Sequence, residues 1–239
     1  MPEYNIDSEF NSYLRPGVAV DIVLFSIVDG KFKVALIKRD DEPYFGNHAL
    51  PGRFVRYDEK IEDTAKKALE TKGNINTSNI FLEQLYTFGQ NLDRDTRIRT
   101  ISIVYYALIN SKEITEQTEN KFYWFSINEL PSMAFDHERI VKFAFDYLYV
   151  KIWDLQDCSS IIMSLLPEKF TLTELQQVYE TICGKLDKRN FRKKFLDSNI
   201  LKPELEKRDG GAFRPAQLFS FYLLSPNRKS WTRHENRKN

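Results

Sequence analysis

The segment LPGRFVRYDEKIEDTAKKALETKGNI, residues 50–75, is the strongest indication of the architecture in this 239-residue chain. It opens with a Leu-Pro-Gly turn, continues through a loop to Glu59, and then carries the pattern of an amphipathic helix up to about residue 72. Lys66, Lys67 and Lys72 form a basic face on that helix. Strand-like sequences lie on both sides, so the segment predicts a loop, a helix and a second loop that follow the early strands of a sheet.

The same segment resembles a Nudix box, the loop-helix-loop with the pattern G-x5-E-x7-R-E-U-x-E-E-x-G-U, in which U is an apolar residue. In that family the glutamates lie on one helix face and hold a divalent metal ion against a diphosphate. Hard cations prefer oxygen ligands, and the metal neutralises the charge that develops during hydrolysis. The resemblance implies an α+β chain whose N-terminal part is a Nudix-like, mixed-sheet α/β/α sandwich.

The three catalytic glutamates of the box are not conserved in this segment. If the box begins at Arg53, which aligns Glu59 with the first glutamate of the pattern, the three positions hold Ala68, Thr71 and Lys72. If it begins one residue earlier, they hold Lys67, Glu70 and Thr71. At most one carboxylate survives beside several lysines, so we predict no metal, no other cofactor and no hydrolase activity. A simple amphipathic helix with a solvated lysine face would explain this helix equally well.

Charge is distributed unevenly along the chain. Residues 185–239 contain 15 Lys and Arg against 6 Asp and Glu, whereas residues 1–184 contain 20 against 28, although the whole chain has a formal charge of +1. A basic segment attached to an acidic body is expected when one end of a protein meets nucleic acid, although a solvated basic tail has the same composition. We therefore predict two domains, residues 1–153 and residues 154–239.

The composition also limits the compartment. Cys158 and Cys183 are too few for a disulfide framework and fit a reducing environment. No run of about 18 apolar residues is present, and no apolar N-terminal stretch follows positive charge, so the sequence predicts neither a membrane span nor a signal peptide. We expect a soluble, cytoplasmic protein with no membrane partner.

Alternating and β-branched residues predict the strands of a mixed sheet around the box. The turn signal Asp29-Gly30 joins the first two into a hairpin. A helix rich in apolar residues at helical spacing follows the segment PSMAFDH, residues 131–137, and continues to about residue 153. The predicted strands cover residues 18–27, 32–39, 80–88, 99–109 and 122–125.

Between two of these strands lies DRDTRIR, residues 93–99, followed by SIVYYAL, residues 102–108. This sequence is similar to the D-R-D-P-R-G-R and S-x-x-Y-x-A-L of Nudix proteins that handle ADP-ribose and of Nudix-related transcriptional regulators; PSMAFDH is also typical of those regulators. Arginines in such a loop suit bidentate phosphate contacts, although a solvated hairpin tip would look the same. A histidine at a helix start is as well explained by a structural role. The candidate effector-binding residues are Arg39, Arg53, Glu59, Arg94, Arg97, Arg99 and His137.

The C-terminal part predicts a winged helix-turn-helix. A short apolar helix over residues 159–166 precedes a capping box that begins at Thr171, and Gly184 ends the helix that the box opens. Asp187 caps the next helix, which buries Phe191 and Phe195 and presents cations on its other side. A hairpin turn at residues 209–211 separates two strands, which form the wing. The candidate DNA-binding residues are Lys185, Lys188, Arg189, Asn190, Arg192, Lys193, Arg208 and Arg214.

The motifs FTLTELQ, residues 170–176, NFRKK, residues 190–194, and RPAQLF, residues 214–219, closely resemble the C-terminal domain of the NrtR-like family of Nudix-related transcriptional regulators. The resemblance, which covers about residues 15–225, implies a homodimer that binds double-stranded operator DNA, which we expect to be palindromic. It also implies a small-molecule effector, either an ADP-ribose-like metabolite or a sugar. We predict a repressor whose inactive Nudix domain senses that effector.

The sequence is also compatible with two other classes of function. An active ADP-ribose-type pyrophosphatase with an appended winged helix would need its missing glutamates to be supplied from elsewhere in the chain. An adaptor that binds RNA or another protein is disfavoured, because the predicted winged helix lacks exposed aromatic pairs suited to base stacking.

Overall fold

The computed structural model describes residues 15–77, 80–114, 121–154, 158–210 and 213–222. Its contacts divide the chain into two compact units, Met1–Leu148 and Tyr149–Asn239. The boundary that the sequence predicts, after residue 153, lies a few residues further along. No helix among the described residues is long and apolar enough to span a membrane.

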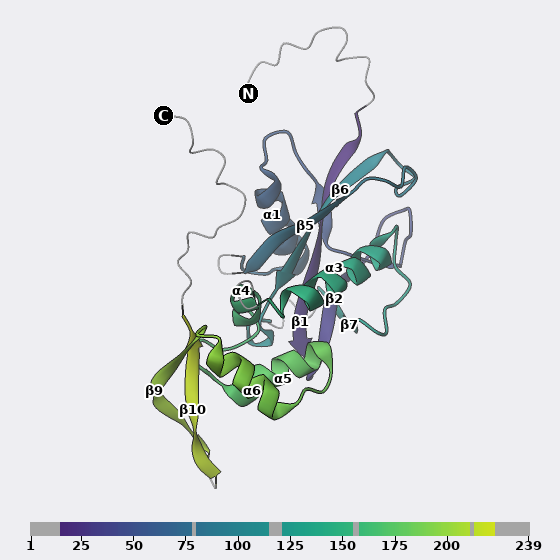
Figure 1. Ribbon diagram of the computed structural model, residues 1–239. Coiled ribbons are helices and arrows are strands. Elements are labelled where there is room, and N and C mark those ends of the chain that lie inside the picture. Colours follow the sequence, from purple (N-terminus) through teal and green to yellow (C-terminus); the bar gives the residue numbers. More distant parts are fainter. Residues whose placement is uncertain (1–14, 78–79, 115–120, 155–157, 211–212, 223–239) are drawn as a thin grey trace, which may run out of the picture. The chain divides into compact units, whose positions relative to one another are not determined.

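The first unit is built on a seven-stranded mixed sheet (Figure 1) with the strand order β3-β2-β1-β6-β5, to which β4 and β7 add by pairing with β1 and β2. β1 and β6 are parallel, and the other pairs in the sheet are antiparallel. The predicted hairpin forms around Asp29 and Gly30. The strands are β1 (Gly17–Val28), β2 (Lys31–Lys38), β3 (His48–Ala49), β4 (Gly52–Phe54), β5 (Phe81–Phe88), β6 (Thr100–Leu108) and β7 (Tyr123–Ser126).

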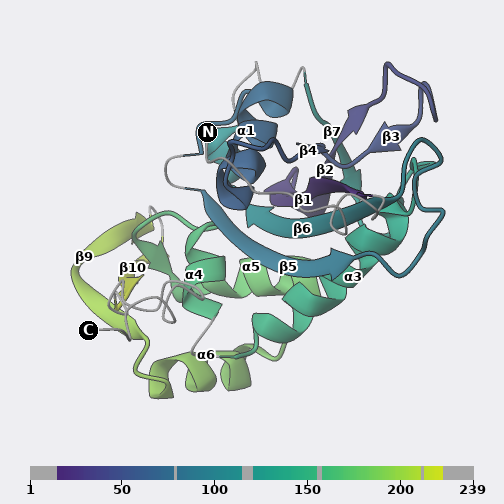
Figure 2. The ribbon, with the colours of Figure 1, turned by 90° about the horizontal axis from the view of Figure 1, so that it is seen from above.

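Helices cover the two faces of this sheet. Figure 2 shows α1 (Ile61–Gly73) on one face and α3 (His137–Lys151) on the other, and a short 3₁₀ helix, η2 (Ser111–Glu113), follows β6. Because side chains alternate along a strand, β1 buries one set of residues against α1 and the intervening set against α3, and its middle is buried throughout. The predicted α+β sandwich is therefore confirmed.

Buried side chains pack on both faces of the sheet. On the α1 side, Val20, Ile22 and Leu24 pack with Ala68 and Leu69 in one buried cluster. On the α3 side, aromatic rings meet: Phe32 lies 6.1 Å from Phe145, and Tyr106 lies 5.7 Å from Tyr147, measured between ring centroids.

The second unit is a winged helix. Two helices are followed by a strand pair, and the predicted helix-turn-helix and wing are both present; β8 adds a third strand, in the order β8-β10-β9. The two-residue β8 was too short to predict from its sequence. The elements are α4 (Cys158–Met163), β8 (Phe170–Thr171), α5 (Leu172–Cys183), α6 (Lys188–Asp197), β9 (Leu201–Gly210) and β10 (Phe213–Phe221).

The sequence misplaced the boundaries of two features in this unit. The first helix ends at Met163 rather than at residue 166. Asp209 and Gly210 belong to β9 rather than to the hairpin turn, because Gly210 pairs with Phe213 at the start of β10. The residues between them lie outside the described part of the chain.

Three predicted helix signals are confirmed. The hydroxyl of Thr171 accepts a hydrogen bond from the backbone N–H of Glu174, whose carboxylate accepts in return from the N–H of Thr171 at 2.7 Å. Gly184 ends α5 with φ 80°, a conformation that other residues adopt at a cost. The side chain of Asp187 accepts from the N–H of Asn190 at 2.8 Å and so caps α6.

An aromatic cluster holds α5 and α6 together. The ring of Tyr179 on α5 lies 5.3 Å from Phe191 and 5.1 Å from Phe195, and these two α6 rings lie 4.6 Å apart. The hydroxyl of Tyr179 is buried and donates to the carbonyl of Ile152 at 2.7 Å, so its polar end is satisfied. Phe191 and Phe195 thereby fix which face of α6 points outward.

We predict that Thr171→Ala lowers the stability of the winged helix by about 1 kcal/mol, because the first turn of α5 loses its capping hydrogen bond. Thr181→Ala is the control: its hydroxyl donates only to the carbonyl of Gln177 within the helix. Urea denaturation of both variants, followed by circular dichroism, measures the difference. Equal stabilities would show that the capping box contributes nothing.

Candidate functional site

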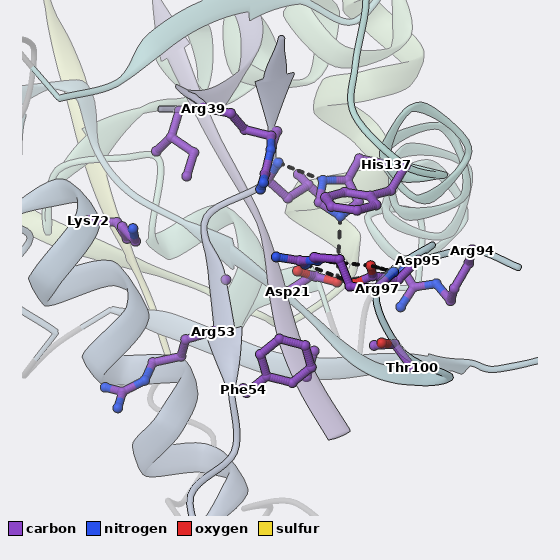
Figure 3. Close-up of a pocket in the computed structure, with 16 residues that line it drawn as sticks. Asp21, Arg39, Arg53, Phe54, Lys72, Arg94, Asp95, Arg97, Thr100 and His137 are labelled. Carbon is purple, nitrogen blue, oxygen red and sulfur yellow. Dashed lines mark hydrogen bonds and ion pairs between the residues drawn. The ribbon is translucent and has the colours of Figure 1, made fainter. Parts of the chain in front are cut away.

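A cavity of about 200 Å³ lies in the first unit at one end of the sheet (Figure 3). Its walls come from β1, β2, the Leu-Pro-Gly turn, β4, the last turn of α1, the loop between β5 and β6, and the start of α3. The charged and aromatic side chains that line it are Asp21, Arg39, Arg53, Phe54, Lys72, Arg94, Asp95, Arg97, Phe135 and His137.

Buried charges form one wall of the cavity. Arg94 is buried, with 6% of the residue exposed, and its guanidinium donates to the carboxylate of Asp136 at 2.7 and 3.2 Å. It also lies 3.7 Å from the carboxylate of Asp21, which accepts a hydrogen bond from the hydroxyl of Ser102 at 2.5 Å. The network joins β1, β6, the β5–β6 loop and the start of α3.

His137 extends this network to the Leu-Pro-Gly turn. Its Nδ1 accepts a hydrogen bond from the backbone N–H of Leu50 at 3.0 Å, so that nitrogen carries no proton. Its Nε2 lies 3.8 Å from the carboxylate of Asp21. Burial lowers the pKa of His137, and the ring is neutral at pH 7. His137 therefore holds the turn in place as well as lining the cavity.

Phe135 organises two further cations that line the cavity. Its ring lies under two guanidinium groups, 5.0 Å from Arg39 and 5.5 Å from Arg97, and 5.0 Å from the ring of Tyr44. Phe135 has φ 55°, a left-handed conformation that costs energy for a residue with a large side chain. Arg97 also forms a two-point ion pair with Asp95 at 3.0 and 2.8 Å. The ion pair and the Phe135 ring together fix the orientation of its guanidinium.

The structure places five of the seven predicted effector-binding residues around the cavity: Arg39, Arg53, Arg94, Arg97 and His137. Glu59 does not line it. Its carboxylate accepts from Lys67 at 2.9 Å, from Thr64 at 3.1 Å and from Arg53 at 3.3 Å, and the hydrogen bond from Lys67 contributes most to lowering its pKa. The guanidinium of Arg99 is turned to backbone carbonyls, including that of Thr100 at 3.2 Å, and braces the loop instead.

The structure favours one of the two alignments of the Nudix box. If the box begins at Arg53, its two flanking apolar positions are Leu69 and Ile75, and both are buried. Its final glycine position is Asn74, which adopts a left-handed conformation with φ 52°. The other alignment would put exposed Asn74 at an apolar position. In the alignment that the structure favours, the glutamate positions hold Ala68, Thr71 and Lys72.

None of these three residues suits a divalent metal ion. Ala68 is buried in the core, Thr71 donates its hydroxyl to the carbonyl of Lys67, and Lys72 lines the cavity with its amine. The nearby Glu70 accepts from Thr77 at 2.5 Å. Within the described ranges, no group of three or more His, Cys, Asp and Glu side chains gathers as a metal site requires.

Among the residues that shape the cavity, Asp21, Phe135 and Lys72 are missing from the predicted effector-binding set. Asp21 could have been found, because a carboxylate in the middle of the apolar strand VAVDIVLF has to be paired. Lys72 was recognised only as a lost glutamate. The role of Phe135 depends on its backbone conformation, for which the sequence has no signal.

The second unit presents a basic surface on α6. Because Phe191 and Phe195 point inward, five of the predicted DNA-binding residues on α6 are exposed on the other side: Lys188, Arg189, Asn190, Arg192 and Lys193. Lys185 is exposed in the preceding turn. Arg192 also lines a groove of about 420 Å³ with Thr173 at the start of α5 and Lys207 on β9.

The two predicted wing residues differ from this group. Arg208 is paired with the carboxylate of Glu174 and donates to the carbonyl of Lys169 at 3.2 Å, so it ties β9 to the start of α5. Arg214 belongs to β10, but its side chain lies outside the described part of the chain.

Both units of the chain are similar to known proteins. Residues 162–221 match the family described as the NrtR DNA-binding winged helix domain. The chain is 33% identical over 220 residues to the ADPR responsive transcriptional repressor NtrR of Acinetobacter baylyi, an alignment that covers 89% of this chain and 85% of that protein. It is also 34% identical over 141 residues to an ADP-ribose pyrophosphatase of Methanocaldococcus jannaschii, which covers 59% of this chain and 78% of that enzyme.

Solved structures of Shewanella oneidensis NrtR extend the comparison. The protein in complex with a 27mer DNA aligns with a TM-score of 0.73 and 31% identity, over 86% of this chain and 93% of that chain. Its Nudix domain in complex with ADP ribose aligns with a TM-score of 0.50 and 29% identity, over 60% of this chain and 94% of that domain.

A Nudix-type sheet joined to a winged helix defines a Nudix-related transcriptional regulator. The match to the NrtR winged helix family and the 33% identity to one relative over most of both chains define the family within this class. The chain belongs to the NrtR family.

We predict that acidification below about pH 6.5 destabilises the first unit through His137. Burial lowers the pKa of the folded imidazole, so below the unfolded pKa the unfolded chain binds more protons and stability falls with pH. His137→Asn keeps an acceptor for Leu50 but cannot titrate, so it should lose less stability between pH 7 and 5.5. Burial also lowers the pKa of His48, and the loss of stability that this causes on acidification is the same in the wild type and in the variant. Urea unfolding at each pH tests this, and equal losses would contradict it.

Proposed function

We propose that this chain is a repressor that binds operator DNA through its winged helix and binds ADP-ribose, without hydrolysing it, in the cavity of the first unit. The observation that carries this proposal is the charge of the cavity. Five cations line it against two carboxylates, and His137 is neutral. A diphosphate linkage carries two negative charges and is complementary to this surplus.

The arrangement of the arginines supports a phosphorylated nucleotide rather than a free sugar as the effector. A neutral pentose would not compensate a surplus of cations, which costs free energy when water is excluded. Phe135 holds two guanidinium groups in fixed positions, and fixed guanidiniums bind phosphate oxygens with little loss of side-chain entropy. The ADP-ribose in the name of the Acinetobacter repressor and in the Shewanella Nudix domain structure agrees with this preference.

The second unit supports the DNA-binding half of the proposal. The exposed cations of α6 lie one helical turn apart, with Lys188 and Arg189 above Arg192 and Lys193, and so form one face suited to a major groove. Lys207 and Thr173 line the same groove as Arg192, which supports a role for them in contacts to the neighbouring phosphates. We further propose a homodimer on a palindromic operator, because a two-fold dimer presents two such helices to two half-sites.

An ADP-ribose pyrophosphatase is the second candidate, because a pyrophosphatase is among the relatives. Its chemistry needs carboxylates to hold a metal ion, and the three glutamate positions hold Ala68, Thr71 and Lys72. The proposal is therefore binding without turnover.

We predict that the purified protein binds ADP-ribose by isothermal titration calorimetry and leaves it intact during long incubation with Mg²⁺ or Mn²⁺. Arg97→Met should weaken binding by about ten- to a hundredfold, because one charged hydrogen-bond donor is lost. Arg99→Met is the matched control, since Arg99 does not line the cavity. Turnover of ADP-ribose that is abolished by Glu70→Gln would support the pyrophosphatase instead.

We also predict that Arg192→Ala weakens binding to operator DNA and that ADP-ribose changes the operator affinity of the wild type. If Arg192 contacts a base, the loss should be about 1–3 kcal/mol on the operator and small on random DNA. If it contacts a phosphate, both DNAs should be affected alike and the salt dependence should become flatter. Arg139→Ala, which removes the same charge from the first unit, is the control. An unchanged affinity for both DNAs would exclude α6 as the reading helix.

A further inference from the structure

We propose that the amine of Lys72 binds the diphosphate of the ligand directly and takes the place that a divalent metal ion has in Nudix hydrolases. This inference rests on the proposed function, since it concerns how the same cavity holds ADP-ribose. It assigns a residue and a charge that sequence reasoning treated only as the loss of a glutamate.

The position of Lys72 carries the first step. The left-handed Asn74 and the buried Leu69 and Ile75 favour the alignment of the box in which Lys72 stands at the last glutamate position. Its side chain lines the cavity from the last turn of α1 (Figure 3). A lysine there is also favoured by the partial negative charge at the C-terminal end of a helix.

The partners of the neighbouring charges carry the second step. On the same helix, Lys66 pairs with Glu62 at 2.8 Å and Lys67 pairs with Glu59 at 2.9 Å. No hydrogen bond or ion pair joins Lys72 to any residue within the described ranges. It is thus a cation that faces the cavity without a protein carboxylate to neutralise it.

The carboxylates supply the third step, because none is left to hold a metal. Asp21 and Asp95, the two that line the cavity, are engaged by Arg94 and Arg97 respectively. Glu59, at the remaining box position, accepts three hydrogen bonds from protein donors. A divalent cation would meet amines where it needs oxygen ligands, so the residues present do not fit one.

Direct binding by an amine has a different thermodynamic character from binding through a metal. The lysine ammonium is a compact point charge that pairs well with phosphate oxygens. The affinity that such a pair contributes does not depend on the concentration of a free metal ion. The protein would therefore respond to its ligand alone, whatever the level of Mg²⁺ around it.

The test is isothermal titration of the full-length protein with ADP-ribose, in excess EDTA and again with millimolar MgCl₂. We expect the same Kd in both, and a weakening of about ten- to a hundredfold in Lys72→Met, which removes the charge but keeps the alkyl chain. Lys72→Arg should stay within a few-fold of the wild type. Lys66→Met, a charge loss on the same helix away from the cavity, should bind as the wild type does.

The outcomes separate this inference from the proposed function. Binding that requires MgCl₂, or a Lys72→Met variant that binds as tightly as Lys66→Met, would overturn the role of Lys72 while ADP-ribose remains the ligand. A wild type that binds no ADP-ribose under either condition would overturn the proposed function and this inference with it. Thermal unfolding of the variants excludes a folding defect, which exposed Lys72 gives no reason to expect.

Discussion

The burial of one guanidinium group, that of Arg94, is the constraint on which the first unit depends. A buried charge is tolerated only when it is paired and hydrogen-bonded, and Arg94 meets this condition by binding Asp136 at the start of α3 and approaching Asp21 in the middle of β1. Removing one partner of such a group typically costs about 3–5 kcal/mol, because the remaining charge is left without compensation. The β5–β6 loop, the central strand and α3 are therefore held in one arrangement.

The same constraint determines the character of the cavity. Arg94, Arg97 and Arg53 are each paired with a carboxylate, so the cavity-lining cations without such a partner among the described residues are Arg39 and Lys72. A hydrolase of this fold uses carboxylates to gather a mobile metal ion. Here the positive charge belongs to side chains of the protein and is permanent.

Much of the fold could be predicted from the sequence because its signals are local. The capping box at Thr171, the stop at Gly184 and the pair Phe191 and Phe195 lie within a turn or two of the structure that they determine. The cavity could be predicted only in part. Arg94 reads as an exposed loop cation until Asp136 is placed beside it, and those two residues are 42 positions apart in the chain.

The approach of Gly52 to Asp21 constrains how sequences of this family can diverge. A Cβ atom at position 52 would lie 2.3 Å from a carboxylate oxygen of Asp21 and 2.7 Å from the carbonyl of Val20, so no larger residue fits. The Leu-Pro-Gly turn and the buried carboxylate are thus two halves of one contact. Over evolutionary time they should be inherited or lost together, whereas Ala68, Thr71 and Lys72 take no part in that contact and can change independently of it.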